Sequence, residues 1–436
     1  MRAPTIASIT KVKGLRLAST SGTSAPLDSD CRLNNGIPCY SPQEIQNAYG
    51  LKSLLSAGFT GSGQTIIIID SFGSPTIAND LAAFDTAYGI PAPPSFKVLA
   101  PLGTVPFDPT NSDMVGWAFE TTLDVEWAHA MAPGANIVLL TSPVSQTEGV
   151  QGLPEFLKLE QYALENKLGK IISQSWAATE NTLFSPAGEK VITDFEDFYR
   201  SASLDGVTIL ASAGDSGSAN VDVNYNVYPF PTVSFPASSP YVTAVGGTSL
   251  YADTSGNYLS ETVWNNDTGA TGGGVSQYFP EPLYQRVLNA YQPLLRGKRA
   301  IPDVAYNADP LTGILVYATF LPSCPGCYFF IGGTSEGSPQ WAGIVADANQ
   351  LAGRPLGYLN PGLYALGALN GSNKLFHDVV AGNNSFDGVP GYNAAPGWDP
   401  TTGWGTPNLP TQDLGTLVRA LAQPSQPFVA ANTPTP

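Results

Sequence analysis

The chain has 436 residues, of which 43% are hydrophobic and only 12% are charged, whereas about 25% of an average globular protein is charged, so a large core is expected. Its 35 acidic residues outnumber the 19 Lys and Arg, which gives a formal charge of −16, and the lack of a basic stripe argues against nucleic acid as a partner. No run of roughly 18 apolar residues occurs, so the sequence predicts no membrane-spanning helix.

Composition divides the chain into three parts. Residues 1–40 are Ser/Thr-rich and aperiodic, and we interpret them as a leader or the remnant of a prosegment. Residues 41–421 alternate strand-like and helix-like runs without an internal repeat or a linker, so we expect one domain there. Residues 422–436 are a low-complexity tail rich in Pro and Thr.

The four cysteines form two local pairs, Cys31 with Cys39 and Cys324 with Cys327. We favour two small disulfides, which are typical of exported proteins. A zinc site is a weaker interpretation because the pairs lie far apart and no histidine cluster accompanies them. A redox-active CPGC is a third, although no thioredoxin-like helix follows it. We therefore expect a secreted protein, even though the first 20 residues contain no apolar signal-peptide stretch.

Short β-rich runs alternate with helical runs along the domain. The predicted strands, several of them apolar on both faces as in buried parallel sheets, are 64–70, 135–140, 170–176, 206–214 and 240–247. The predicted helices, each ending at a glycine, are 154–169 and 192–206. This alternation predicts an α/β fold with a largely parallel, twisted sheet flanked by helices.

In such a sheet, ligands collect beyond the carboxyl ends of the strands. Asp70, Trp176 and Asp215 each lie at or just past the end of a strand-like run, and so does the GGTSEG turn at 332–337. We therefore look for functional side chains among these positions.

Two serines lie among glycines, Ser216 in GDSG and Ser335 in GTSEG. A trypsin-like role for Ser216 is rejected because that fold is all-β and needs a suitable upstream histidine, whereas His129 lies in a helical stretch. Ser335 lies where a strand passes through a Gly-Gly turn into a helix, near backbone N–H groups at the positive end of that helix. The alternative for Ser335 is a simple helix N-cap.

A carboxylate is expected to replace the missing histidine, because the chain has only two histidines in all. Glu120 and Asp124 are four residues apart and share one face of a predicted helix. The alternative is a solvated acidic face, but Trp117, Phe119 and Leu123 make the surroundings apolar. Two carboxyl groups that share a proton titrate together, and one pKa is raised.

GTSEG also fits the nucleophile elbow of α/β-hydrolases, in which an acid and then a histidine follow the serine. His377 follows Ser335, but only Glu336 and Asp347 are available as the acid, and Asp347 falls on the helix that begins at the serine. An esterase that uses Ser335 and His377 is therefore kept as an alternative.

Seven motifs between about Tyr40 and Leu417 resemble those of the sedolisins, in the same order. Sedolisins are serine-carboxyl peptidases related in fold to subtilisins, and they include tripeptidyl peptidases. The motifs are ETTLDVEWAHAMAP, SAGDSG, FPASSPYVTAVGGTSL, GGGVSQYFPEPLYQ, IPDVAYNADPLTG, GGTSEGSPQWAG and GWDPTTGWGTPN. The resemblance implies that residues 41–421 form a single catalytic domain with a subtilisin-like fold.

The resemblance implies a role for each matched residue. Ser335 is the nucleophile, and Glu120 is its general base and later the acid, oriented by Asp124. Asp215 belongs to the oxyanion hole, where it must be protonated in order to donate a hydrogen bond. The implied accessory members of the proton network are Asp70 and Trp176.

One structural Ca²⁺ ion is also implied by the resemblance. Its ligands would be two carboxylates and three backbone carbonyl groups, those of Asp378, Val379, Ala395, Gly397 and Asp399. Ligation by oxygen alone suits this hard cation. The spacing is not that of an EF-hand, and without the resemblance a plain turn at Asp399 is the preferred interpretation.

The sequence thus predicts an acid-active endopeptidase or tripeptidyl peptidase that acts as a monomer on peptide or protein substrates. The alternative that is not an enzyme is a calcium-binding surface domain that keeps the fold without catalysis.

Overall fold

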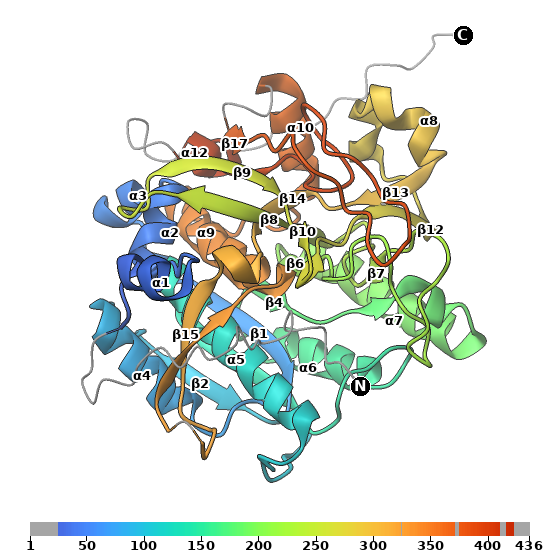
Figure 1. The fold of residues 1–436 in the computed structure, drawn as a ribbon. Coiled ribbons are helices and arrows are strands. Elements are labelled where there is room, and N and C mark those ends of the chain that lie inside the picture. The colour runs from blue at the N-terminus through green and yellow to red at the C-terminus, as the bar shows by residue number, and fades with distance from the viewer. Residues whose placement is uncertain (1–24, 324, 371–374, 410–415, 423–436) are drawn as a thin grey trace, which may run out of the picture.

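The computed structural model describes residues 25–323, 325–370, 375–409 and 416–422. Figure 1 shows a central twisted sheet with helices on both faces. Seven strands of this eight-stranded sheet are parallel, and β9 pairs antiparallel with β8 at one side. In spatial order the parallel strands are β14 (Val304–Asn307), β8 (Thr243–Ala252), β6 (Thr208–Ser212), β4 (Ile171–Gln174), β1 (Thr65–Ser71), β3 (Asn136–Ser142) and β2 (Phe96–Leu99), and β9 is Tyr258–Val263. The expectation of a largely parallel α/β sheet is confirmed.

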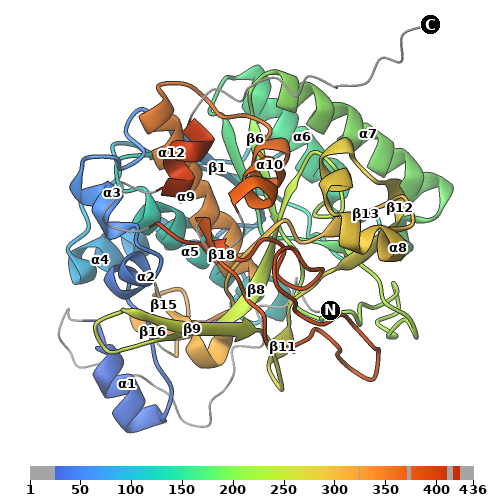
Figure 2. The same cartoon turned by 90° about the horizontal axis from the view of Figure 1, so that it is seen from above.

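The sheet has a hydrophobic core on each face, because successive side chains of a strand point to opposite sides. Ile66 and Ile68 of β1 belong to the core that contains Trp341, whereas Ile67 and Ile69 belong to the core that contains Trp176. Helices α5 (Ser112–Met131) and α9 (Gly337–Ala352) cover the first face. Helices α6 (Leu153–Glu165) and α7 (Pro186–Leu204) cover the second, as Figure 2 shows from above.

The remaining elements surround this sandwich. The other helices are α1 (Asp28–Asn35), α2 (Pro42–Ala48), α3 (Lys52–Ser56), α4 (Ile77–Tyr88), α8 (Gln292–Leu295), α10 (Asn360–Asn370) and α12 (Thr416–Ala422). The two-stranded pairs are β5 (Ala178–Thr179) with β7 (Ser234–Phe235), β10 (Asn265–Asn266) with β11 (Gly269–Ala270), β12 (Gly274–Pro280) with β13 (Lys298–Ile301), β15 (Ile314–Ala318) with β16 (Cys327–Ile331), and β17 (Phe376–His377) with β18 (Thr406–Pro407). None of the described helices combines the length and the apolar content needed to cross a bilayer.

Two predicted helix boundaries are wrong for local reasons. The helix predicted for 192–206 begins earlier, at Pro186, because the Ser185 side chain caps it by accepting a hydrogen bond from the Gly188 N–H at 3.2 Å. The helix predicted for 154–169 ends at Glu165, and Lys167 takes the left-handed conformation (φ 52°) that a C-terminal glycine usually supplies.

The described fold begins before residue 40, within the segment expected to be a leader. Asp28 is buried and accepts hydrogen bonds from Arg32 and from the Cys39 N–H, and Cys31 is disulfide-bonded to Cys39. Arg32 also donates to the Ala252 carbonyl at 2.8 Å. Residues 28–40 therefore pack on the domain. The tail at 422–436, apart from its first residue, and Cys324 of the second expected disulfide lie outside the described residues.

Several carboxyl groups outside the predicted catalytic set are completely buried. Burial raises the pKa well above its usual range for four of them, Glu126, Glu160, Glu336 and Asp347. Neutral donors contact three of them. Glu126 accepts from the Tyr317 N–H at 3.0 Å and Glu160 from the Gln174 amide at 2.9 Å. None of these four carboxyl groups has an ion pair with a described residue.

Candidate active site

The sheet brings the predicted strand-end residues to one edge. Strands β1, β4 and β6 are parallel neighbours, so their carboxyl ends, near Asp70, Trp176 and Asp215, lie on the same side of the sheet. The turn that carries Ser335 is a short 3₁₀ helix, η5 (Thr334–Glu336), directly before α9, and it contacts β6, β8 and β14.

The Ser335 turn requires glycine at its entry. Gly333 adopts a positive φ of 108°, and a Cβ atom on Gly332 would lie 2.5 Å from the Ala308 carbonyl oxygen. The two glycines therefore let the chain turn sharply against the sheet, and Ser335 is left only 2% exposed.

Helix α5 carries the acidic pair and packs against the Ser335 turn. Glu120 and Asp124 lie one turn apart, and both are buried. The Ser175 hydroxyl donates to Asp124 Oδ1 at 2.8 Å, and the Thr121 hydroxyl donates to Asp70 Oδ2 at 3.0 Å. Asp124 is thus held by the residue that follows β4, and the end of β1 at Asp70 is bonded to α5.

These carboxyl groups form one electrostatic unit with Ser335. Burial raises the pKa of Glu120 well above its usual range, the Ser335 hydroxyl lowers it, and the charges of Asp70 and Asp215 raise it further. Burial is also the main cause that raises the pKa of Asp124, followed by Asp70 and Glu120, and it raises the pKa of Asp70 to about 7. Neither Glu120 oxygen has a hydrogen bond of ordinary length to a described residue. The unit can therefore accept and share protons.

Asp215 approaches the Ser335 turn from the carboxyl end of β6. Its Oδ1 atom accepts hydrogen bonds from the Thr334 N–H at 2.7 Å and from the Thr334 hydroxyl at 2.8 Å. The Gly214 N–H donates to the same hydroxyl at 2.9 Å. Burial outweighs these bonds and raises the pKa of Asp215 to about 6. If Oδ2 were protonated, Asp215 would be a hydrogen-bond donor beside Thr334, the residue that precedes Ser335.

Two other predicted residues have different surroundings. Trp176 is buried, with its ring centroid 4.8 Å from that of Phe156, and no described residue accepts a hydrogen bond from its Nε1. His377 stacks on Tyr258 with centroids 3.8 Å apart, and burial lowers its pKa to about 4. No described contact joins Trp176 to Glu120 or His377 to Ser335, so the esterase alternative gains no support.

The residues implied for calcium come from two segments, 378–379 and 395–399, which are joined by a hydrogen bond. Asp378 Oδ2 accepts from the Gly397 N–H at 2.9 Å, and Asp399 Oδ2 accepts from the Ala395 N–H at 3.0 Å. Burial first, and then the charges of Asp399 and Asp378, raise the pKa of Tyr291 to about 12. Neither carboxylate has a described ion pair. This oxygen-rich, anionic arrangement fits a hard cation.

Carboxylates alone would not hold that cation. Among the described residues, no group of three or more His, Cys, Asp or Glu side chains is placed to bind a metal ion. The implied set has only two carboxylates, and backbone carbonyl groups would have to complete it.

Sequence reasoning missed three hydroxyl groups that hold the carboxyl groups in place: Thr121, Ser175 and Thr334. Each is adjacent in sequence to a predicted site residue, namely Glu120, Trp176 and Ser335. The signal was therefore present, but only the packing of α5 against the strand ends shows which carboxyl group each hydroxyl meets.

The chain is similar to known peptidases along most of its length. It is 38% identical over 352 residues to kumamolisin from Bacillus sp. (strain MN-32), an alignment that covers 79% of this chain and 57% of kumamolisin. It is 34% identical over 270 residues to tripeptidyl-peptidase 1 from Mus musculus, covering 56% of this chain and 42% of that protein. The chain thus spans little more than half the length of the curated relatives it matches.

A solved structure agrees with these similarities. Pseudomonas sedolisin, a serine-carboxyl proteinase complexed with two molecules of pseudo-iodotyrostatin, superposes with a TM-score of 0.71 at 30% identity. The match covers 85% of this chain and 96% of that one. No protein-family model matches the chain.

Proposed function

Because the chain belongs to the sedolisin family of serine-carboxyl peptidases, we propose that it hydrolyses peptide bonds through an acyl-enzyme on Ser335. The observation that carries the proposal is the electrostatic unit of Glu120 with Ser335, next to an Asp215 carboxyl bonded to Thr334. In this proposal, the Glu120 carboxylate takes the role that a histidine imidazole has as general base in other serine peptidases. The Asp215 carboxyl group takes the role of an N–H donor in the oxyanion hole.

In the proposed mechanism, the Glu120 carboxylate takes the proton of the Ser335 hydroxyl as its oxygen attacks the scissile carbonyl carbon. Asp124, held by Ser175, orients Glu120 and shares its proton. Glu120 then gives the proton to the leaving amine, and in the second half-reaction it activates the water that releases the acyl group. Asp70 and Trp176 remain proposed accessory residues.

Asp215 is proposed to donate a hydrogen bond to the developing oxyanion, and this sets an upper pH limit on activity. The group must be protonated, so kcat/KM is expected to fall as the pH rises through about 6, the value to which burial raises the pKa of Asp215. Acid activity follows from this requirement. Both endopeptidase and tripeptidyl peptidase action are compatible with it.

Asp215→Asn is expected to remove the fall in activity near pH 6, because an amide donates a hydrogen bond at every pH. Asp215→Ala is expected to lower kcat by about 10²–10³-fold, as the loss of an oxyanion donor typically does. The measurement is a pH profile of kcat/KM on a denatured protein or a quenched peptide, with the exposed Asp205→Asn as control. An Asn variant whose profile still falls near pH 6 would contradict this role.

We also propose that one Ca²⁺ ion stabilises the fold, held by Asp378 and Asp399 with the carbonyl groups of Val379, Ala395 and Gly397. Chelation is expected to lower the melting temperature by several degrees, because a ligand that binds only the folded state stabilises it. Differential scanning calorimetry with and without EGTA measures this. Asp378→Asn should remove the response to chelator, and an unchanged melting temperature in the unsubstituted protein would end the calcium proposal.

Secretion and a monomeric state remain proposals. The disulfide between Cys31 and Cys39 supports an oxidising compartment, where such bonds persist.

A further inference from the structure

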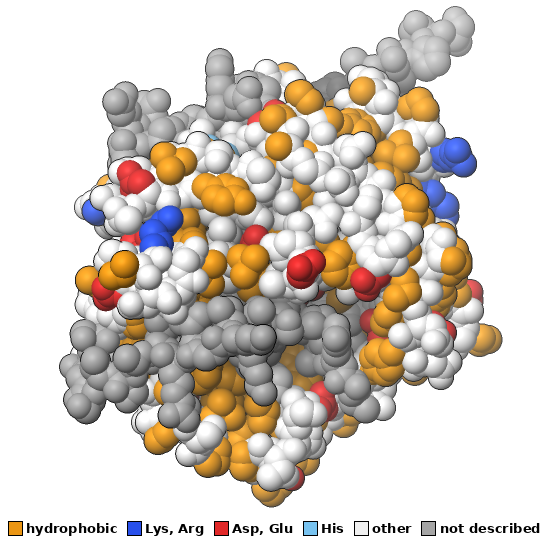
Figure 3. All heavy atoms as spheres, in the orientation of Figure 1, with side chains coloured by type: hydrophobic (Ala, Val, Ile, Leu, Met, Phe, Trp, Pro, Cys, Tyr) orange, Lys and Arg blue, Asp and Glu red, His pale blue; other side chains and the backbone are white. Residues whose placement is uncertain are grey.

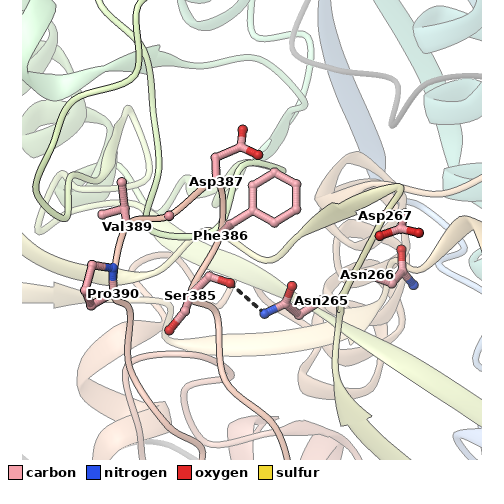
Figure 4. A pocket seen from close by; sticks show the side chains of 9 residues that line it. Asn265, Asn266, Asp267, Ser385, Phe386, Asp387, Val389 and Pro390 are labelled. Atoms are coloured by element: carbon pink, nitrogen blue, oxygen red, sulfur yellow. Dashed lines mark hydrogen bonds between the residues drawn. The ribbon is translucent and has the colours of Figure 1, made fainter.

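A hollow of about 710 Å³ lies between two loops that the proposed mechanism does not use (Figure 4). One wall is the start of the β10–β11 hairpin, residues 265–267, and the other is the loop at 385–390. The walls are joined by Asn265, whose amide donates to the Asn383 carbonyl at 2.9 Å and to the Ser385 carbonyl at 2.8 Å. Hydrogen bonds of one side chain therefore connect the two walls of the hollow.

Both walls rest on the chain segment that carries Asp215. The Ala270 N–H donates to the Asp215 carbonyl at 3.0 Å, and the Gly217 N–H donates to the Ala270 carbonyl at 2.8 Å. On the other wall, a Cβ atom on Gly217 would lie 2.8 Å from the Cβ atom of Phe386. The segment that supports both walls therefore also carries the Asp215 carboxyl group, which is bonded to Thr334, the residue before Ser335.

The lining of the hollow is anionic and aromatic. Asp267 lies on one wall, and Asp387 lies on the other next to the Phe386 ring (Figure 4). No Lys or Arg lines the hollow, and neither carboxylate has a hydrogen bond or an ion pair to any residue that the structure describes. Basic side chains on the face shown in Figure 3 lie at its left and right margins.

We propose that this hollow is a substrate subsite for a basic side chain, Lys or Arg, a few residues from the scissile bond. A carboxylate on each wall and an aromatic ring on one of them match a cation on a flexible stem, because the ring face attracts cations as the carboxylates do. The proposal rests on the proposed peptidase function and adds a substrate class to it.

The first test is a set of decapeptides with one fixed scissile bond, in which Lys or Gln occupies each other position in turn. At one position within about four residues of the bond, Lys is expected to raise kcat/KM about tenfold over Gln. The double variant Asp267→Asn/Asp387→Asn should lower this ratio to about two, and Phe386→Leu should lower it about threefold. Asp205→Asn, which changes an exposed carboxylate elsewhere, should leave the ratio unchanged.

Salt gives a second readout, because exposed charge pairs are screened. Raising the ionic strength to about 0.5 M should weaken the preference for Lys in the unsubstituted protein and have little effect on the ratio in the double variant. A Lys preference that survives in the double variant, or no Lys preference at any position, would overturn the subsite.

Binding separates this inference from the proposed function. With Ser335→Ala and fluorescent forms of the Lys and Gln peptides, anisotropy should give about tenfold tighter binding for Lys, lost when Asp267→Asn/Asp387→Asn is added. If Lys binding is tighter but the unsubstituted protein hydrolyses no peptide, the proposed peptidase function is wrong and the proposed subsite is supported. If the protein hydrolyses peptides but binds the Lys and Gln peptides equally, the proposed function is supported and the proposed subsite is wrong.

Discussion

Ser335→Ala is expected to lower peptide hydrolysis by roughly 10⁴–10⁶-fold, since removal of a serine nucleophile leaves only the contributions of binding and of the oxyanion hole. Ser335 lies directly before α9, and its hydroxyl lowers the pKa of Glu120. The preceding residue, Thr334, is hydrogen-bonded to Asp215. No other described serine combines these contacts. The measurement is single-turnover cleavage of a quenched peptide in acidic buffer, with intact mass used to detect the acyl-enzyme.

The matched control is Ser216→Ala, which changes the serine of the GDSG motif. Ser216 lies in the same segment as Asp215 and pairs through its backbone with Ala270, yet no hydrogen bond of its hydroxyl is found among the described residues. Its activity is expected to stay within about twofold of the unsubstituted protein. If Ser335→Ala kept a tenth of the activity, or if Ser216→Ala lost it, the assignment of the nucleophile would be wrong.

Glu120→Gln is expected to lower kcat by about 10²–10⁴-fold with little change in KM, because it removes a general base that acts only as the reaction proceeds. The two side chains have nearly the same shape, so packing in α5 is kept. Burial raises the pKa of Glu120 and the neighbouring carboxyl groups raise it further, which gives this group the basicity that proton transfer from a hydroxyl requires.

Glu126→Gln provides the control for burial of a carboxyl group in the same helix. Glu126 is fully buried, and burial raises its pKa, but its partner is the Tyr317 N–H instead of Ser335. This variant should keep kcat within a few-fold while its thermal stability changes. An equal loss of kcat in both variants would show that the effect of Glu120→Gln comes from α5 as a whole and not from proton transfer.

The sheet was predictable because its strands are apolar on both faces and end at recognisable polar residues. Residues 64–70 were expected to be a strand, and β1 covers Thr65–Ser71. The strand expected at 240–247 begins at Thr243 and continues to Ala252, since its second half pairs with β9, and that pairing partner has no apolar run to reveal it. Strand β14 was missed because it is only four residues long, too short to show a clear apolar run.

The site was predictable in its members but not in its contacts. Spacing alone placed Glu120 and Asp124 on one helical face, yet nothing in their spacing shows that Ser175, directly after β4, donates a hydrogen bond to Asp124. The Asp267–Asp387 hollow was not expected at all, because its walls are 120 residues apart in sequence and are brought together by tertiary contacts such as those of Asn265. Contacts between distant loops are set by tertiary packing, which local patterns do not encode.

Unfolding of this chain is coupled to the release of protons from four carboxyl groups that are buried in the core, Glu126, Glu160, Glu336 and Asp347. Their folded pKa values lie above those of the open chain, so their contribution to the free energy of unfolding is complete below about pH 4 and is lost as the pH rises through the folded values. Near neutrality, each molecule that opens releases these protons to the medium. An unbuffered solution of this protein would therefore turn more acidic as it melts, and calorimetric enthalpies would vary with the ionisation heat of the buffer chosen.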